Sequence, residues 1–156
     1  EIRLSLVGSE MCIRDSLHTH RLTLGTTRAM EILDLTETVR HWVRETGVRQ
    51  GLLTVMSPHT TARITINERE VALQQDMVAW LEQLAPADRP YGHNHAPVDD
   101  RANAHAHLLG LFLNATESVP VVSGELVLGG WQSLFLIELD GPRPLREVQL
   151  HLLALD

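Results

Sequence analysis

The order of short and long apolar patterns along the chain most constrains what it can fold into. Residues 18–27, 51–57 and 62–67 are short runs that alternate or are rich in apolar and β-branched side chains, which is typical of strands. Residues 34–47 and 68–84 are longer, and their apolar side chains recur at helical spacing. We expect the strands 51–57 and 62–67 to pair with each other. The first half of the chain therefore combines strands with helices.

The last third of the chain predicts strands almost throughout. It contains four runs, 118–122, 125–128, 131–139 and 146–155, which are separated by turn residues at 123–124, by Gly129-Gly130 and by turn residues at 140–142. Before them, residues 102–113 are rich in Ala and Leu, which favours a helix in their first half. Strand, helix, two strands, helix and a strand-rich end predict an α+β fold, with one domain and two or three helices.

Both long predicted helices have recognisable ends. Asp34 and Glu37 form the Asp-x-x-Glu pattern of a capping box, and Gly47 is a suitable end for the first helix. Pro86 ends the second helix. The apolar residues of the second helix fall on one face: Leu73, Met77, Trp80, Leu81 and Leu84.

Composition excludes several classes of function. A chain of 156 residues with 44% hydrophobic and 21% charged residues is typical of one globular domain with a sizeable core. The net charge of -7 opposes a nucleic-acid partner, because phosphate binding requires a basic surface. No apolar run is long enough to span a bilayer. All 13 basic residues are arginine, which excludes lysine Schiff-base chemistry. We therefore expect a small-molecule substrate, without nucleic-acid or membrane partners.

The N-terminal stretch has an unusual sequence. Residues 6–16 resemble the in-frame translation of a transposon-end adapter used in preparing sequencing libraries. We therefore expect residues 1–16 to be foreign and residues 17–156 to form the native domain. The sole cysteine, Cys12, would then be foreign as well. Charged residues interrupt the apolar core that a secretory signal peptide would need, so we expect a cytoplasmic protein.

Four of the nine histidines lie in one short window that begins at Tyr91. They are His93, His95, His105 and His107, and the same window contains Asn94, Asp99, Asp100 and Asn103. Neutral imidazole and carboxylate groups are the usual ligands of zinc and related metals, and histidine also moves protons near neutral pH. We expect the chemistry here. On a strand His105 and His107 would share one face, whereas on the predicted helix they point to nearly opposite sides. On that helix His107 shares a face with Asp100, which makes it the inward candidate; the alternative is that both histidines face solvent.

Other candidate residues have a structural explanation beside the functional one. His59 follows Pro58 in a loop between predicted strands, where it either serves a site or belongs to a polar turn. Asn67 and Glu68 end a predicted strand, where they offer an amide and a carboxylate or merely cap a helix. Trp131 begins a strand, where it either stacks on a flat ligand or lies in the core.

Four motifs occur in a characteristic order along the chain. They are HTTARITINE at 59–68, YGHN at 91–94, NAHAH at 103–107 and LGGWQSLFLIELDGPR at 128–143. Together they resemble the YjbQ family, whose members are often named secondary thiamine-phosphate synthases. The likeness runs from about His18 to the C-terminus, and the Trp-Gln strand followed by Asp-Gly-Pro-Arg is its most specific part.

The resemblance implies an α+β fold with a mixed β-sheet, assembled as a homotrimer, with metal binding by histidines in some members. The named activity joins a pyrimidine pyrophosphate to a thiazole phosphate, gives thiamine phosphate and pyrophosphate, and is regarded as a side activity. The resemblance places function at the motif positions His59, Asn67, Glu68, Asp76, His93, His107, Trp131 and Gln132. Gly130, Arg69 and Leu109 depart from the family's common Thr, Asn and basic residue, which bears on substrate specificity rather than on the fold.

We hypothesise a metal-dependent enzyme that acts on a small phosphorylated or heterocyclic metabolite. His59, His93 and His107 would hold a divalent metal, most plausibly zinc, with Mg²⁺ as the alternative for a pyrophosphate substrate. The predicted catalytic residues are Glu68, Asp100 and Asn67, and the predicted substrate-binding residues are Trp131, Gln132, Arg63 and His105.

A second hypothesis is a non-catalytic, trimeric metal- or metabolite-binding protein.

Displacing pyrophosphate requires cationic stabilisation of the leaving group, and the chain has neither lysine nor a glycine-rich phosphate loop. The arginines near the motifs are the remaining candidates: Arg63, Arg69, Arg101 and Arg143. This supply of cations suits a low-level activity better than an efficient synthase.

Overall fold

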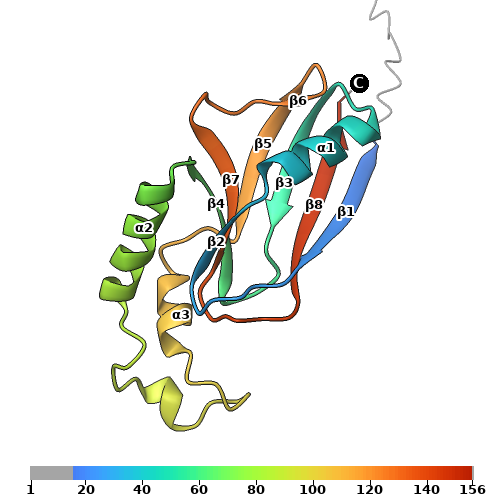
Figure 1. Cartoon of the computed structure of the whole chain (residues 1–156). Coiled ribbons are helices and arrows are strands. Elements are labelled where there is room, and N and C mark those ends of the chain that lie inside the picture. Colours follow the sequence, from blue (N-terminus) through green and yellow to red (C-terminus); the bar gives the residue numbers. More distant parts are fainter. Residues whose placement is uncertain (1–15, 156) are drawn as a thin grey trace, which may run out of the picture.

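The computed structural model describes residues 16–155, which form two sheets and three α-helices (Figure 1). The residues predicted to be foreign, 1–16, lie outside the described part except for Ser16. Among residues 16–155, no helix combines the length and the apolarity that a membrane span requires. The predicted α+β class, with one domain and three helices, is confirmed.

The larger sheet has five strands in the order β1-β8-β3-β5-β6, and the smaller sheet has three in the order β2-β7-β4. All pairings between these neighbours are antiparallel. The larger sheet comprises β1 Leu17–Leu24, β3 Gln50–Met56, β5 Thr116–Val122, β6 Glu125–Leu126 and β8 Arg146–Ala154. The smaller sheet comprises β2 Glu31–Asp34, β4 Ala62–Glu68 and β7 Gln132–Glu138. The helices are α1 Thr36–Thr46, α2 Val71–Leu84 and α3 Ala104–Leu109, with a 3₁₀ turn, η1, at Gly92–His95.

The predicted pairing of the strands now labelled β3 and β4 is wrong. β3 pairs with β5 and β8, whereas β4 pairs with β7 in the other sheet. Leu53 and Val55 of β3 and Ile64 of β4 are buried in one shared core, so the two strands face each other across it. The alternating pattern shows which side of a strand is buried. Two strands have the same pattern whether they are neighbours in one sheet or lie in two sheets packed face to face.

Two hydrophobic cores lie on the two sides of the smaller sheet. The first joins it to the larger sheet and to α1, where Val39 and Val43 are fully buried. The second joins it to α2 and α3, which lie along one flank of the molecule in Figure 1. The middle strand, β7, is therefore buried on both faces, consistent with its continuous apolar run Leu-Phe-Leu-Ile.

The two long helices bury their apolar residues to very different extents. Asp34 accepts a hydrogen bond from the Thr36 amide at 2.8 Å and so helps to start α1, and Gly47 ends it with φ of 74°. In α2 only Leu81 is fully buried, and its predicted inward face is only partly covered. Trp80 is 58% exposed. A large apolar surface therefore remains on α2.

One ion pair lies entirely inside the molecule. Glu138, at the end of β7, is fully buried, and Arg146, at the start of β8, is 5% exposed. Arg146 donates to both carboxylate oxygens of Glu138, with Nε to Oε2 at 2.6 Å. Thr26 also donates to Glu138, and Thr61 accepts from Arg146 at 3.0 Å. This cluster fastens the two sheets and two loops together.

Replacing Arg146 with Met should destabilise the protein strongly, because it leaves the Glu138 carboxylate buried without its cation. We expect a loss of about 3–5 kcal/mol in the free energy of unfolding, measured by urea denaturation. Arg21→Met is the matched control, since Arg21 pairs with Glu147 on the surface, and it should cost less than about 1 kcal/mol. Equal losses in the two variants would contradict this role for the buried pair.

Candidate functional site

Two histidines of the predicted window lie in edge-to-face contact and line one cavity. His93 lies in η1 and His107 in α3, and their ring centroids are 5.2 Å apart with the rings nearly perpendicular, at 79°. The cavity has a volume of about 450 Å³ and is lined by Tyr91, Gly92, His93, Ala104, His107 and Leu108. His107, the predicted inward member of the His-x-His pair, is among the residues that line the cavity. Apolar walls with a few convergent polar groups are typical of a small-molecule site.

Side-chain amides hold this part of the chain together. Asn94 of η1 accepts a hydrogen bond from the Ala104 amide at 3.1 Å and thereby caps α3. Asn103, the residue before α3, is 4% exposed, and its Oδ1 lies 3.1 Å from Nε2 of His93. Its Nδ2 donates to Asp140 at 2.8 Å. The loop that carries His93 is thus anchored both to α3 and to the end of the β7 segment.

Asp140 is the hub of this anchor. It is 6% exposed and accepts hydrogen bonds from Asn103, Arg101 and Arg143. Burial by itself raises the pKa of Asp140, but the hydrogen bonds from Arg101, Asn103 and Arg143 outweigh burial and hold that pKa below its usual value. In the sequence, Asp140 belongs to the turn pattern Asp-Gly-Pro, which predicts only a turn and gives no sign of this second role.

His59 is engaged elsewhere in the fold. Its Nε2 accepts a hydrogen bond from the Glu147 amide at 2.9 Å, at the start of β8. Burial and the nearby Arg146 guanidinium lower the pKa of His59 below its ordinary value of 6.5, despite the opposing charge of Glu138. The neutral imidazole is the form that can accept this bond, so His59 helps to fix the loop between β3 and β4.

A second group of predicted residues lies together at one end of the smaller sheet. Glu68 stands opposite Gln132 in the β4–β7 pairing, and Asn67 stands opposite Ser133. Trp131 lies beside them and is 78% exposed, so the core explanation for this tryptophan is excluded. The Asn67 side chain accepts a hydrogen bond from the Glu68 amide at 2.8 Å.

The strand-end group and the histidine cavity lie at opposite ends of α2. The group at the end of β4 immediately precedes α2, whereas η1 follows it, and Figure 1 shows η1 at the far end of the molecule from the β4–α2 junction. A helix of 14 residues is roughly 20 Å long at 1.5 Å per residue. The predicted catalytic and metal-binding residues therefore do not form one compact site within one chain.

Two further predicted residues stand apart from the cavity. Asp100 is exposed in the loop before α3, with φ of 59°, and is not among the side chains that line the cavity. Asp76 is exposed on α2. The expected role of Asp100 as a base stays a prediction that the cavity geometry does not support.

Arg63 and His105 are predicted to bind substrate. His105 belongs to α3, and Arg63 of β4 lies beside Gly110 at the end of that helix. Nε of Arg63 and Nδ1 of His105 are buried and have no hydrogen-bond partner. Burial lowers the pKa of His105, against the opposing effects of Asp140 and of a hydrogen bond to the Leu139 backbone. A Cβ atom at Gly110 would lie 2.6 Å from Arg63, so the glycine makes room for the guanidinium.

The three histidines expected to hold one metal ion are not gathered within the chain. Among residues 16–155, no three His, Cys, Asp or Glu side chains come close enough to hold a metal. His93 and His107 supply two imidazoles at one cavity, and a third ligand would have to come from outside this pair. Two imidazoles suit part of a zinc site, because such sites use three or four ligands.

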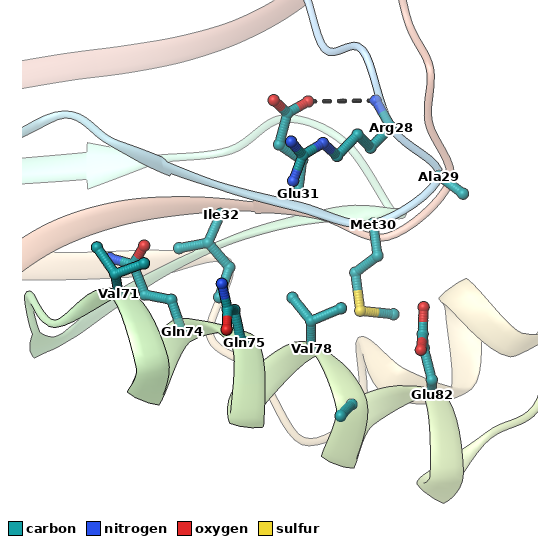
Figure 2. A pocket seen from close by; sticks show the side chains of 11 residues that line it. Arg28, Ala29, Met30, Glu31, Ile32, Val71, Gln74, Gln75, Val78 and Glu82 are labelled. Atoms are coloured by element: carbon teal, nitrogen blue, oxygen red, sulfur yellow. Dashed lines mark hydrogen bonds between the residues drawn. The ribbon is translucent and has the colours of Figure 1, made fainter.

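A larger cavity, of about 610 Å³, lies between β2 and α2. Figure 2 shows the side chains of Met30 and Val78 facing each other across it. The Glu31 carboxylate at its edge is occupied by the Thr27 and Arg28 backbone amides. This groove has no convergent set of catalytic side chains, so the smaller histidine cavity is the stronger candidate.

Comparison with known proteins assigns the chain to a family. The family described as UPF0047 protein YjbQ-like matches residues 20–154. The chain belongs to the YjbQ family. A UPF0047 protein of Methanothermobacter thermautotrophicus is 42% identical over 127 residues, which are 81% of this chain and 86% of that protein. The YjbQ-family protein YugU of Bacillus subtilis is 33% identical over 123 residues, or 78% of this chain and 89% of that protein.

Solved structures of YjbQ-like proteins share the fold. A YbjQ-like protein of unknown function from Sulfolobus solfataricus P2 superposes with a TM-score of 0.83 at 36% identity, covering 90% of this chain and 99% of that one. A hypothetical protein from Aeropyrum pernix K1 gives a TM-score of 0.80 at 39% identity, covering 88% and 98%. The comparisons thus agree with the sequence on the YjbQ family and leave its function open.

The lowered pKa of His59 should make stability pH-dependent. Its folded pKa lies below the ordinary 6.5, so the unfolded chain takes up the proton first, and the contribution of His59 is present above about pH 6.5 and lost as the pH falls further. In metal-free protein, the difference in unfolding free energy between wild type and His59→Gln should be constant above about pH 7 and shrink towards pH 5. A difference that stays constant or grows with acid would contradict this, as measured by urea denaturation across the pH range.

Proposed function

We propose that this protein is a metal-dependent enzyme acting on a small phosphorylated or heterocyclic metabolite. The observation that carries the proposal is the perpendicular pair His93 and His107, 5.2 Å apart on the wall of one cavity. Their anchoring by Asn103 and Asn94 favours this, because preorganised imidazoles are what a metal or proton-transfer site requires. Thiamine-phosphate synthesis is the named family activity, and we propose it as a side activity of this chain.

His93 and His107 would hold zinc, because imidazole is a usual zinc ligand. Mg²⁺, which prefers oxygen ligands, would instead enter bound to a pyrophosphate substrate. When bound, the zinc ion would supply Lewis acidity toward a phosphate-bearing substrate. His59 is left out of the ligand set, because its Nε2 already accepts a hydrogen bond from the Glu147 amide. The third ligand would come from a second copy of the chain, because no third His, Cys, Asp or Glu side chain among residues 16–155 is close enough.

The chain's own residues limit the chemistry of pyrophosphate release. Arg101 and Arg143 are committed to Asp140, and Arg69 pairs with Asp34 at 3.2 Å. Arg63 donates to the His59 carbonyl at 3.3 Å, and its buried Nε has no hydrogen-bond partner. Few guanidinium donors therefore remain for a leaving pyrophosphate, which supports a slow side activity rather than an efficient synthase.

The alternative is a trimeric metal- or metabolite-binding protein without turnover. The two proposals differ in coordination, because a structural zinc site is closed by four protein ligands and a catalytic one keeps a position for water or substrate. The cytoplasmic location expected from the sequence stays a prediction.

We also propose that the chain assembles as a homotrimer. A cyclic trimer needs two different complementary surfaces on each copy, and this chain offers two apolar ones. On the larger sheet, Leu17, Leu153, Leu52 and Pro120 stand opposite one another across four strands. Leu153 is 39% exposed, and the buried residues of β8 point to the other face. The second surface is the exposed side of α2 with Trp80.

Trimer assembly would give the distant strand-end group a role. Asn67, Glu68 and Trp131 lie near the start of α2, whereas the histidine cavity of the same chain lies beyond the end of α2. They are therefore too far away to reach that cavity. A neighbouring copy packed against α2 could bring its own residues to either group. The proposal thus accounts for two separated sets of motif residues in one family.

Metal content tests the proposed site directly. Purified protein never exposed to chelator should contain about one divalent ion per chain by mass spectrometry, and His107→Ala should lose it while keeping its far-UV circular dichroism. His41→Ala, an exposed change on α1, is the control and should retain the ion. Thiamine-phosphate formation should fall on adding chelator. Folded wild type without metal, or a His107→Ala variant that retains it, would sink the assignment.

The oligomeric state tests the assembly. Wild type should have the mass of three chains by light scattering, and Leu153→Glu or Trp80→Glu should reduce it, because each places a carboxylate in an apolar interface. Thr38→Glu adds the same group to the exposed side of α1 and should leave the trimer intact. A monomeric wild type, or variants that all remain trimeric, would speak against the proposed surfaces.

A further inference from the structure

The strongest feature outside the cavity itself is a chain of buried polar groups that ends at His93. It begins at Asp140, whose carboxylate receives donors from Arg101 and Arg143. It continues through the buried side chain of Asn103, which donates from Nδ2 to Asp140 at 2.8 Å. It ends where Oδ1 of Asn103 lies 3.1 Å from Nε2 of His93. In each of these hydrogen bonds, only one assignment of donor and acceptor is favourable.

The charge on Asp140 sets that assignment. A carboxylate held by two guanidinium groups is ionised and can only accept hydrogen bonds. Asn103 must therefore turn its NH₂ group toward Asp140, because the reversed amide would place two oxygens against each other. Its carbonyl oxygen then faces His93. The backbone cannot compete for this side chain, because Asn94 rather than Asn103 caps the Ala104 amide of α3.

The carbonyl oxygen of Asn103 in turn decides which nitrogen of His93 carries the proton. An oxygen accepts but cannot donate, so Nε2 of His93 must be protonated. In a neutral imidazole this leaves the lone pair on Nδ1. We propose that Asp140 is a positioning residue that acts through Asn103 to hold His93 in the Nε2–H tautomer, with Nδ1 as the atom that serves the cavity.

This inference deepens the proposed function, since Nδ1 is then the atom of His93 that would bind metal or accept a proton. The tautomer itself belongs to the metal-free protein, so it is tested without any assumption about activity. Hydrogen bonds to the second nitrogen of a metal-binding histidine commonly fix its tautomer, usually through a carboxylate or a backbone carbonyl. Here an amide is placed between the imidazole and the carboxylate, and the carboxylate determines the orientation of that amide.

The test is nitrogen NMR of metal-free protein labelled with ¹⁵N in histidine. Long-range ¹H–¹⁵N spectra distinguish the two ring nitrogens, and the pH is kept about two units above the ordinary histidine pKa of ~6.5. Wild-type His93 should show Nε2 protonated with a preference of about tenfold over Nδ1. A proton found mainly on Nδ1 would overturn the proposal.

Two variants test different hydrogen bonds in the series from Asp140 through Asn103 to His93. Asn103→Ala removes the acceptor and leaves Asp140 with both arginines, so His93 should show averaged nitrogen shifts from two exchanging tautomers. Asp140→Asn allows the Asn103 amide to reverse, which should raise the Nδ1–H population. Asp88→Asn removes a carboxylate from an exposed position after α2 and should leave the His93 shifts unchanged. Wild-type shifts in Asn103→Ala, or the same change in Asp88→Asn, would overturn the proposal.

Zinc titration of the same proteins separates this inference from the proposed function. If the tautomer is fixed as expected but wild type binds no Zn²⁺, the metal-site proposal fails and the positioning role stands. If wild type binds Zn²⁺ and the tautomer is unaffected by Asn103→Ala, the positioning role fails and the metal site stands. With both correct, Asn103→Ala should weaken Zn²⁺ binding about 10- to 100-fold.

Discussion

Two buried carboxylates at the end of one strand organise this molecule. β7 is covered on both faces, so Glu138 and Asp140 leave it inside the protein rather than in water. A buried charge is costly unless it is paired and hydrogen-bonded. Glu138 is accordingly paired with Arg146, and Asp140 is paired with Arg101 and Arg143. The pair of Glu138 with Arg146 joins the two sheets. Asp140 joins the histidine loop to the sheets, so the fold and the candidate site depend on the same physical requirement.

The histidine cavity is held in place by hydrogen bonds to the buried side chains of Asn103 and Asp140. The other motif residues lie at the opposite end of α2. This division explains why the chain offers two sets of functional side chains and two exposed apolar surfaces. In the proposed trimer, a neighbouring copy would bring the two sets together. The bound arginines also limit the chemistry, because guanidinium groups that neutralise Asp140 are not free to stabilise a leaving phosphate.

Much of the fold could be predicted from local patterns. Alternation and helical spacing located α1, α2, β3, β4 and the strands of the last third, and the Ala- and Leu-rich run before them located α3. β2 was missed, since four residues are too few for a periodic pattern to emerge. The pairing of β3 with β4 was wrong, because alternation does not distinguish a neighbour in the same sheet from a strand across the core.

The candidate site, like the fold, could be predicted from the sequence only in part. Sequence by itself determined the kinds of element, the family resemblance and the window in which His93 and His107 lie, because these depend on residue types and short spacings. Only the tertiary structure decided that His59 serves a loop contact and that Asp140 supports His93. Asn103 and Asp140 are 37 positions apart, and the direction of a hydrogen bond between such residues depends on which groups folding brings together and which of them remain charged.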